Sequence, residues 1–455
     1  MPTLRPQAVA GTFYPGDAQA LLGEVNELLE GVDSLEVRFG HPKVLIVPHA
    51  GYIYSGATAA QAYSELVSAR GLVKRVVLLG PVHRVAVRGL ALPGVDLFET
   101  PLGRIPIDAE AVRLLGDLPQ VVTSAPAHAM EHSLEVQLPF LQRVLGEFSL
   151  LPLAVGDATQ AQVIEVLERL WGGPETLIVI STDLSHYHGY ETAQRIDSDT
   201  ADRIARLETG LDHSQACGAT PLNGLLGLAK QKGLSIRRLA VCNSGDTAGG
   251  RGRVVGYSAF ALDEGGTVTR EEAGRTLIGM ARASIDARLA FREAPRADGA
   301  AWLAQPGATF ITLMREGHLR GCIGSLAPHR SLGEDVIANA QAAAFNDPRF
   351  PAMTLTEWPS VQTEVSLLSP ARLIRFADEE DLIAKIVPGE DGLILEAAGR
   401  RGTFLPQVWE SIPDKQQFLA QLRLKAGLPA DFRLARCRVL RYRVAKWKQS
   451  DFPAH

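Results

Sequence analysis

The chain has 455 residues, of which 46% are hydrophobic and 21% charged, and a formal net charge of -5 at pH 7. This length and apolar content predict two or three globular domains, each able to bury a core. No apolar run approaches the ~18 residues that span a bilayer, and the mild charge gives no reason to expect nucleic acid. We therefore expect neither a membrane nor a nucleic-acid partner.

The cysteines and the first residues of the chain indicate the cellular compartment in which we expect the protein. The cysteines are widely spaced and form no CxxC pair, which argues against a disulfide framework. The start of the chain lacks the charged and then apolar layout of a signal peptide, so we expect a cytoplasmic protein. Each thiol is then judged alone, at Cys217, Cys242, Cys322 and Cys437.

Apolar periodicity near the start predicts alternating helices and strands. Residues 17–31 have a helical pattern, 43–48 form an apolar strand, 55–66 return as a helix, and 74–79 form a second apolar strand. This order favours parallel strands with helices on both faces.

The same alternation continues to about residue 261. A helix is expected over 129–145, although Pro139 would bend or interrupt it. Strands at 150–155 and 176–181 flank a further helix, and the last strand covers 254–261. We predict an α/β sheet domain with flanking helices over residues 1–264.

A small, polar run at 262–267 marks the domain boundary, so the second domain is placed at 267–455. It opens with the capping box Thr269-Arg-Glu-Glu272 of a long helix. A β-hairpin is predicted over 309–323, and later strands alternate their side chains. This half is predicted to be α+β with a largely antiparallel sheet.

Four reactive side chains in the first domain each follow a short apolar run: His49, His83, Asp183 and Cys242. Ligands of open α/β sheets bind beyond the carboxyl ends of the strands, so these side chains are expected to converge there. Two imidazoles and a thiolate suit iron(II), copper or zinc and leave positions open for substrate or oxygen. Each residue alone has an ordinary explanation as a polar group at a strand end.

A carboxylate and an imidazole stand three apart in Asp183-Leu-Ser-His186. An imidazole titrates near neutral pH, so His186 is the candidate proton carrier, and Asp183 is expected to orient it or a metal ligand. The alternative is that Asp183 only caps a helix, a role compatible with the first.

His128-Ala-Met-Glu-His132 supports a rival hypothesis, because it fits the H-x-x-E-H pattern of inverted zinc peptidases. A helix would place both histidines on one face, and the glutamate would act on water. A further alternative is that His132 and Glu135 line the same pocket as His49.

The first half resembles the Memo family, which is similar in fold to the class III extradiol dioxygenases. The resemblance implies metal ligation by His49, His83 and Cys242, with iron(II) expected first and copper as the alternative, and pocket roles for Asp183 and His186. The dioxygenases use a glutamate where Cys242 stands, so catechol cleavage is not implied. The matching segments are Ala10-Gly-Thr-Phe-Tyr-Pro15, Pro48-His-Ala-Gly-Tyr-Ile-Tyr-Ser-Gly56, Gly80-Pro-Val-His83, Glu131-His-Ser-Leu-Glu-Val-Gln-Leu-Pro139, Ser181-Thr-Asp-Leu-Ser-His186 and Cys242-Asn-Ser-Gly-Asp246.

Glycines surround Cys322 on the returning strand of the predicted hairpin, where Arg320 would favour the thiolate. The alternative is an inert strand cysteine. The second half is similar to the AMMECR-type domain, and a chain with both halves resembles the B and A proteins of the AmmeMemoRadiSam set. That resemblance implies a separate partner of the radical S-adenosylmethionine (SAM) class. The matching segments are Phe310-Ile-Thr-Leu313, Leu319-Arg-Gly-Cys-Ile-Gly324, Ala343-Ala-Phe-Asn-Asp-Pro-Arg-Phe350 and Glu364-Val-Ser-Leu367.

The leading hypothesis is a metal-dependent oxidoreductase, related to dioxygenases, that acts on a small molecule. Alternatives are a metal-binding interaction protein without turnover, and a zinc hydrolase centred on His128 and His132. The residues expected to contact substrate are Tyr52, Tyr54, His132, Arg320 and Cys322. The sequence does not predict an oligomeric state.

Overall fold

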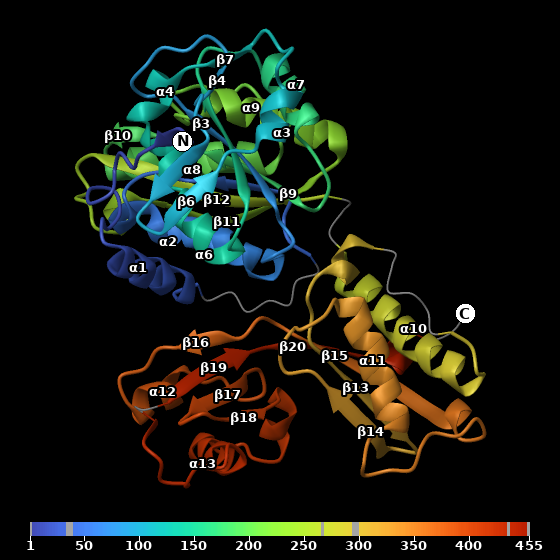
Figure 1. Cartoon of the computed structure of the whole chain (residues 1–455). Coiled ribbons are helices and arrows are strands. Elements are labelled where there is room, and N and C mark those ends of the chain that lie inside the picture. The colour runs from blue at the N-terminus through green and yellow to red at the C-terminus, as the bar shows by residue number, and fades with distance from the viewer. Residues whose placement is uncertain (1, 33–39, 265–267, 294–299, 435–436, 453–455) are drawn as a thin grey trace. The chain divides into compact units, whose positions relative to one another are not determined.

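The computed structural model describes residues 2–32, 40–264, 268–293, 300–434 and 437–452. The chain divides into two compact units (Figure 1). The first contains Met1–Val32 and His41–Thr267, and the second contains Val268–His455 together with the short segment Asp33–Gly40. Each unit is described by itself below.

A nine-stranded sheet forms the centre of the first unit, in the order β10-β12-β2-β9-β3-β8-β4-β7, with β11 paired to β12. Neighbours in the central run β2-β9-β3-β8 are parallel, and these strands are almost entirely buried because helices cover both faces. The strands are β2 (Val44–Val47), β3 (Arg75–Pro81), β4 (Leu90–Leu92), β7 (Val121–Thr123), β8 (Ser149–Val155), β9 (Thr176–Ser181), β10 (His186–His188), β11 (Ser235–Asn243) and β12 (Val254–Asp263).

The predicted parallel strands are confirmed, with one addition to their order. β2 and β3 are both parallel members of the sheet, but β9 lies between them. The strand that ends at Ser181 is therefore hydrogen-bonded directly to the strand that precedes His49, with Val47 opposite Ser181. This pairing positions the candidate site.

Side chains of β2 alternate between two separate cores. Leu45 and Val47 pack with α1, α2 and α6, whereas Val44 and Ile46 pack with α7, α8 and α9. Strand side chains point to opposite faces in turn, so one strand contributes to both cores. The helices are α1 (Ala18–Glu30), α2 (Tyr52–Tyr63), α3 (Ala109–Leu114), α4 (Ala125–Ala129), α5 (His132–Glu135), α6 (Leu138–Leu145), α7 (Gln160–Arg169), α8 (Tyr190–Ala205) and α9 (Ala219–Lys232).

The single helix predicted over 129–145 is wrong, because the structure has the three short helices α4, α5 and α6 in this part of the chain. Glu131 interrupts the first two: its backbone is extended, and its side chain accepts a hydrogen bond from Ser133 N as the N-cap of α5. A second start follows at Gln137, with Pro139 in the first turn of α6. The breaks turn His132 away from the line of α4.

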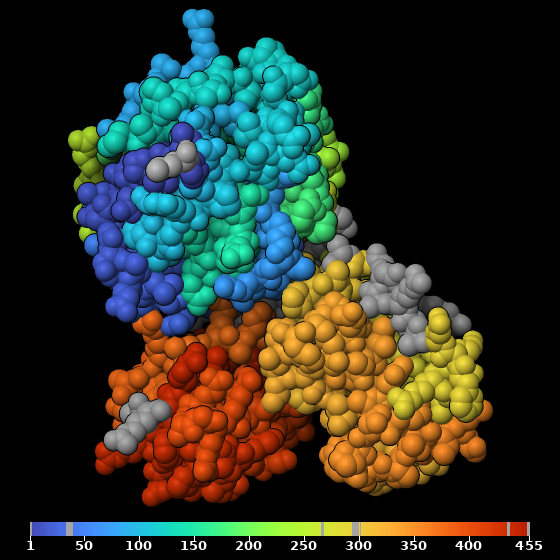
Figure 2. Space-filling model, in the orientation of Figure 1, coloured from blue at the N-terminus to red at the C-terminus, as the bar shows by residue number. Residues whose placement is uncertain are grey.

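The N-terminal segment is anchored on the buried carboxylate of Glu135. Arg5 donates to it, as do the backbone N–H groups of Ala8 (2.8 Å) and Val9 (3.0 Å), and the Tyr14 hydroxyl is a further donor. β1 (Leu4–Arg5) pairs with β5 (Leu97–Thr100), which pairs with β6 (Gly103–Pro106). Dark blue N-terminal residues accordingly lie beside cyan ones in Figure 2.

The second unit contains two antiparallel four-stranded sheets, in the orders β14-β13-β15-β20 and β16-β19-β17-β18. Its α+β, antiparallel character is as predicted, although the strands form two sheets and not one. The strands are β13 (Thr309–Arg315), β14 (His318–Gly324), β15 (Val361–Leu368), β16 (Arg372–Ile374), β17 (Gly392–Ala397), β18 (Arg400–Phe404), β19 (Arg438–Tyr442) and β20 (Val444–Lys448).

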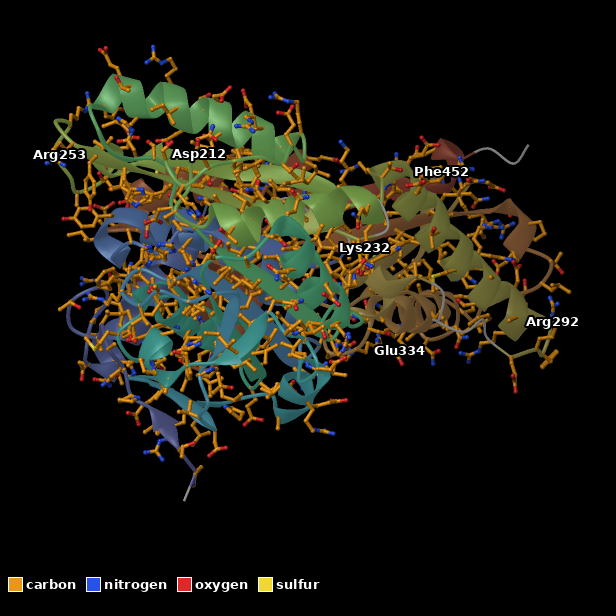
Figure 3. All side chains as sticks on the ribbon, turned by 90° about the horizontal axis from the view of Figure 1, so that it is seen from above. Asp212, Lys232, Arg253, Arg292, Glu334 and Phe452 are labelled. Atoms are coloured by element: carbon orange, nitrogen blue, oxygen red, sulfur yellow. The ribbon has the colours of Figure 1, made fainter. Side chains whose placement is uncertain are left out.

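The capping box predicted at Thr269 is present, and a second capping box occurs at Ser331. Thr269 exchanges hydrogen bonds with Glu272 at the start of α10 (Arg270–Leu289), and Ser331 does so with Glu334 at the start of α11 (Leu332–Phe345). Figure 3 labels Glu334 on its helix. Two shorter helices, α12 (Glu379–Lys385) and α13 (Lys415–Lys425), accompany the second sheet. Within the described ranges, no helix is both long and apolar enough to cross a bilayer.

Candidate metal centre

Three histidines of the first unit gather in one place. His49, His83 and His132 each offer a ring nitrogen, and these atoms lie within 4.8 Å of one another. The ring centroid of His49 lies 5.3 Å from that of His83 and 5.3 Å from that of His132. The centroids of His83 and His132 are 4.7 Å apart. In the described part of the chain, this is the one group of three or more such side chains close enough to hold a metal ion.

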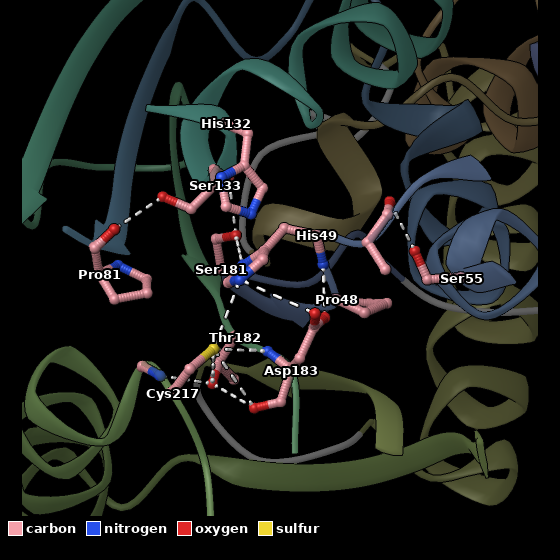
Figure 4. Close-up of polar contacts among 12 residues, drawn as sticks. Pro48, His49, Ser55, Pro81, His132, Ser133, Ser181, Thr182, Asp183 and Cys217 are labelled. Atoms are coloured by element: carbon pink, nitrogen blue, oxygen red, sulfur yellow. Dashed lines mark hydrogen bonds and ion pairs between the residues drawn. The ribbon is translucent and has the colours of Figure 1, made fainter. Parts of the chain in front are cut away.

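Each histidine stands at the end or start of an element. His49 lies two residues beyond β2, His83 two residues beyond β3, and His132 is the first residue of α5. Figure 4 shows His49 and His132 above the residues that follow β9. His49 is 1% exposed, whereas the side chains of His132 and His83 are 18% and 29% exposed. The cluster is therefore closed at His49 and open to solvent at His83.

Ser181 fixes the tautomer of His49. The Ser181 hydroxyl donates its hydrogen to the Ser133 carbonyl at 2.7 Å, and His49 Nδ1 lies 2.8 Å from the same oxygen. A hydroxyl has one hydrogen, so Nδ1 must carry the proton and donate. The other nitrogen, Nε2, then keeps a lone pair for a ligand.

Gln137 holds Ser181 in this arrangement. Its side-chain N–H donates to the Pro48 carbonyl at 2.8 Å and to Ser181 Oγ at 3.0 Å. The amide oxygen accepts from the Tyr63 hydroxyl at 2.8 Å, which assigns the orientation of the amide. Tyr63, Gln137 and Ser181 thus form a buried chain of hydrogen bonds that ends at His49.

Glu131 performs the same task for His83. Its carboxylate accepts from the backbone N–H of His83 at 2.7 Å and lies 2.9 Å from His83 Nδ1, while His132 Nδ1 is 3.3 Å away. Burial opposes the charge of this carboxylate, but the His83 interactions outweigh burial and lower the pKa of Glu131 to about 2. Ionised Glu131 only accepts hydrogen bonds, so Nδ1 of His83 donates and its Nε2 is free.

Burial lowers the pKa of two of the three histidines. Burial lowers the pKa of His49 well below its usual value, with further lowering from the charges of His132 and His83. The pKa of His132 is also lowered, chiefly by burial. Metal ions bind the neutral imidazole, so these two shifts favour the form of His49 and His132 that binds metal.

Asp183 contacts His49 and not His186. Its carboxylate accepts from the His49 backbone N–H at 2.8 Å and approaches His49 Nε2 to 3.8 Å. Burial raises the pKa of Asp183. No hydrogen bond joins Asp183 to His186 among the described residues, and His186 lies half-buried on β10. Of the two roles predicted for Asp183, orienting His186 or orienting a metal ligand, its contacts with His49 fit the second.

Cys242 is not a member of the three-residue cluster. Its Sγ lies 3.0 Å from Thr58 Oγ1 of α2. Cys242 stands opposite Tyr257 on β12, and β12 separates β11 from β2. Two strand spacings amount to about 10 Å, which explains why a residue at the same sheet edge does not join His49. His132, expected in the pocket wall or as a zinc ligand together with His128, supplies the third imidazole.

Sequence reasoning missed Cys217, which lies in the loop before α9. Its Sγ is 3.4 Å from His49 Nε2, and it accepts from the Asp183 backbone N–H at 3.3 Å (Figure 4). No local pattern indicates this position, because Cys217 follows no apolar run and belongs to no motif. Burial, with a smaller effect of Asp183, raises the pKa of this thiol to about 12.

The two tyrosines expected at the substrate differ in position. Tyr52 is buried, and its hydroxyl donates to the Val136 carbonyl at 2.8 Å, so the hydroxyl is part of the core. Tyr54 is 39% exposed. Phe13 of the N-terminal segment, by contrast, packs against His132 with 4.8 Å between ring centroids. It forms a wall that the sequence did not indicate.

The H-x-x-E-H segment does not form a peptidase site. His128 is on α4 and His132 begins α5, so the two do not share one helical face. His128 is buried, with Nε2 2.7 Å from the Ala91 carbonyl, and burial lowers its pKa to about 4. Glu131, the residue required to act on water, is bound to His83. The alternative pocket role of Glu135 is also replaced by its contact with Arg5.

Arg320 and Cys322 belong to the second unit. Arg320 is nearly buried and forms two hydrogen bonds to Glu357, at 2.8 and 3.1 Å, so it is held away from the expected role beside the thiol. Arg349 instead donates to the Cys322 carbonyl at 3.1 Å, and Asp347 accepts from the Cys322 backbone N–H at 2.8 Å. The thiol itself lies 3.4 Å from Thr312 Oγ1.

The residues present fit a metal ion. Three imidazoles, two of them with the remaining nitrogen held by Ser181 or Glu131, form a borderline-soft donor set, suited to zinc, copper or iron. Partial exposure at His83 leaves room for a further ligand. The fold and the site thus define an α/β protein with a three-histidine centre at the edge of a mixed sheet whose central strands are parallel.

The sequence model of a family described as Memo-like protein matches residues 5–261. A MEMO1 family protein of Aquifex aeolicus is 38% identical over 56% of this chain and 97% of its own length. A second, from Methanosarcina mazei, is 35% identical over 57% of this chain and 99% of its own. The chain therefore belongs to the Memo family.

The remainder of the chain matches a second family. The AMMECR1 model covers residues 278–447, so Memo and AMMECR1 domains occur in one chain. Among solved structures, an uncharacterized protein from Pyrococcus horikoshii is 36% identical, covers 38% of this chain and 89% of its own, and has a TM-score of 0.36.

Proposed function

We propose that the first unit is a metal-dependent oxidoreductase that acts on a small molecule at the His49, His83 and His132 cluster. The observation that carries this proposal is the fixed tautomer of two of the three histidines. Ser181 and the Glu131 carboxylate each take one ring N–H, which leaves the opposite nitrogens of His49 and His83 with a lone pair. A ring nitrogen of each of the three histidines lies within 4.8 Å of one from each of the others. Three histidines that were merely close together would not need hydrogen-bond partners that fix their tautomers.

The chain's own residues have separate tasks in this proposal. His49, His83 and His132 would hold the ion, which when bound supplies Lewis-acid or redox chemistry at an open position. Asp183 holds the His49 backbone, and half-buried His186 is the candidate proton carrier. Phe13 packs against the ring of His132 and forms one wall beside it. The family's similarity in fold to extradiol dioxygenases supports oxidation as the reaction class.

Metal analysis tests the proposal directly. Anaerobically purified wild type is expected to bind one ion per chain, and His49→Ala, His83→Ala and His132→Ala are each expected to weaken binding by at least about tenfold. His128→Ala is the matched control, because His128 is a buried histidine outside the cluster. Undiminished metal in the three cluster variants would refute the centre, and loss in His128→Ala alone would restore the peptidase hypothesis.

Oxygen uptake separates catalysis from mere binding. Metal-loaded wild type is expected to consume oxygen with phenolic or thiol reductants, and His186→Gln is expected to lower the rate while keeping the metal. A loaded protein that consumes no oxygen with any of these compounds would instead support a metal-binding interaction protein.

The identity of the metal and of a partner are further proposals. We infer iron(II) first and copper second from the family resemblance, together with a donor set that accepts both. The same resemblance supports a separate radical SAM protein as a partner. Mixing the two purified proteins and measuring their mass in solution tests this, since co-elution is expected and separate elution contradicts it.

A further inference from the structure

The thiol of Cys217 contacts the one ring nitrogen of His49 that is left for a metal ion. Ser181 leaves Nε2 of His49 with the lone pair, and Cys217 Sγ lies 3.4 Å from that nitrogen (Figure 4). Asp183 Oδ2 is 3.8 Å from the same nitrogen, which is too far for a hydrogen bond. Among the described residues, Cys217 is therefore the hydrogen-bond donor that reaches Nε2.

The thiol has one hydrogen to donate and one unoccupied acceptor close to it. Sγ accepts from the backbone N–H of Asp183 at 3.3 Å, so its own hydrogen points elsewhere. The Asp183 carbonyl is 3.7 Å from Sγ and already accepts from Cys217 N at 3.2 Å and from Thr182 Oγ1 at 2.8 Å, one donor for each of its two lone pairs. Thr182 Oγ1 lies farther from Sγ, at 3.8 Å. The thiol hydrogen is thus donated to His49 Nε2.

The loop around Cys217 holds the sulfur at this distance. The backbone N–H of Gly218 donates to Thr182 Oγ1 at 2.9 Å. A Cβ at Gly218 would lie 2.7 Å from Thr182 Cβ and 2.8 Å from the Ser181 carbonyl, so the backbone here packs directly against the end of β9. The same strand end therefore fixes both the tautomer of His49 and the position of the thiol beside it.

A neutral imidazole has one nitrogen lone pair, which cannot accept a hydrogen and bind a metal ion at once. We propose that Cys217 is a positioning residue that holds the His49 ring in the metal-free site and competes with the ion for Nε2. When the ion binds, the S–H···N hydrogen bond breaks and a nitrogen–metal bond forms. The hydrogen stays on the sulfur and turns towards the Asp183 carbonyl, so no proton or electron is transferred. This inference rests on the proposed function, because it requires an ion at the three histidines.

Zinc affinity measures the competition, since Zn²⁺ has no redox chemistry of its own. Cys217→Ala removes the competing hydrogen and is expected to bind Zn²⁺ about 2- to 10-fold more tightly than wild type, the effect of one modest hydrogen bond. Cys217→Ser keeps a hydrogen-bond donor and is expected to remain closer to wild type. Cys437→Ala is the control for loss of a thiol elsewhere, because Cys437 Sγ contacts the Arg433 carbonyl in the second unit, and its affinity should equal that of wild type.

Equal or weaker Zn²⁺ binding by Cys217→Ala would overturn the proposal, because removal of a competitor cannot lower affinity. That result would leave the three-histidine centre intact as long as wild type binds the ion. Absence of Zn²⁺ binding from wild type and from Cys217→Ala alike would refute the centre, and this proposal with it.

The infrared S–H stretching band gives a second readout that does not need a Cys217 variant to fold. A variant with Cys242, Cys322 and Cys437 all changed to Ala has Cys217 as its one thiol. Addition of Zn²⁺ is expected to move the band to higher wavenumber, because the S–H group loses its nitrogen acceptor. A band that stays in place would contradict the competition, and a band that disappears would do so too, since the sulfur would then have lost its hydrogen.

Discussion

At the residue scale, the site depends on side chains that do not touch the metal position. The Ser181 hydroxyl has three partners, and only one assignment of hydrogens satisfies all of them. The Glu131 carboxylate interacts with both the backbone N–H and the ring Nδ1 of His83. These partners determine which nitrogen each histidine presents.

Ser181→Ala tests this dependence. Without the hydroxyl, His49 Nδ1 loses its acceptor and the ring its fixed tautomer, so metal affinity is expected to fall by about 10- to 100-fold. Titration with Co²⁺ measures the change. Ser258→Ala is the control, because the Ser258 hydroxyl is buried without a hydrogen-bond partner among the described residues, and its affinity should equal that of wild type. Equal affinities in both variants would show that Ser181 has no such role.

His128 gives the first unit an acid sensitivity. Burial lowers its pKa from 6.5 to about 4, so the unfolded chain takes up a proton first as pH falls. The stability due to neutral His128 is present above pH 6.5 and is lost between about 6.5 and 4, up to about 3 kcal/mol. Urea unfolding of His128→Gln between pH 7 and 4 should therefore show a weaker loss than wild type. Parallel pH curves would contradict this assignment.

At the element scale, the sequence predicted strands better than helix boundaries. β2, β3, β8 and β9 were found from their apolar runs, because strands buried on both faces need no alternation. The breaks between α4, α5 and α6 were missed, since the deciding interaction, Glu131 with His83, joins residues 48 positions apart. His132 was consequently assigned to the pocket wall and not to the cluster.

The site residues also divide into those that the sequence predicted and those that it did not. His49 and His83 follow parallel strands, and the strand-end rule found them. The same rule failed for Cys242, because it does not reveal that β12 intervenes. Cys217 lies in a loop whose position depends on packing against β9, which no local pattern encodes.

Gly80 on β3 lets α5 pack closely against the strand. A Cβ there would lie 2.8 Å from Ser133 Oγ and 3.0 Å from a Leu134 methyl group. Gly80→Ala is expected to push α5 and His132 outward, to cost about 1–3 kcal/mol in the free energy of unfolding, and to lower metal occupancy. Chemical denaturation and metal analysis measure both effects. Gly23→Ala on α1, where nothing lies within 4 Å, should leave occupancy unchanged.

At the scale of the whole molecule, each unit has hydrophobic cores of its own. Two cores lie on the faces of the nine-stranded sheet, and separate clusters fill the second unit. The exposed residues Arg253 and Arg292, one from each unit, are labelled in Figure 3. A single free energy of unfolding is therefore not expected to describe the whole chain.

Calorimetry should resolve this division. Metal at 100 times its dissociation constant stabilises the state that binds it by about 2.7 kcal/mol. Only the transition of the first unit is expected to move to higher temperature, and His83→Ala should abolish the shift. Equal movement of both transitions, or of the second alone, would contradict the assignment of the metal centre to the first unit.

The pairing of β2 with β9 affects how fast a bound ion would be released from the site. His49 and Ser181 are joined to strands buried on both faces, whose backbone amides should exchange with deuterium only when the whole unit opens. His132 stands on a four-residue helix, and His83 is the more exposed member. A bound ion would therefore leave by detaching from His132 and His83 first, while His49 keeps its place until global unfolding. Residence time at this centre would be set by the short helix and not by the sheet.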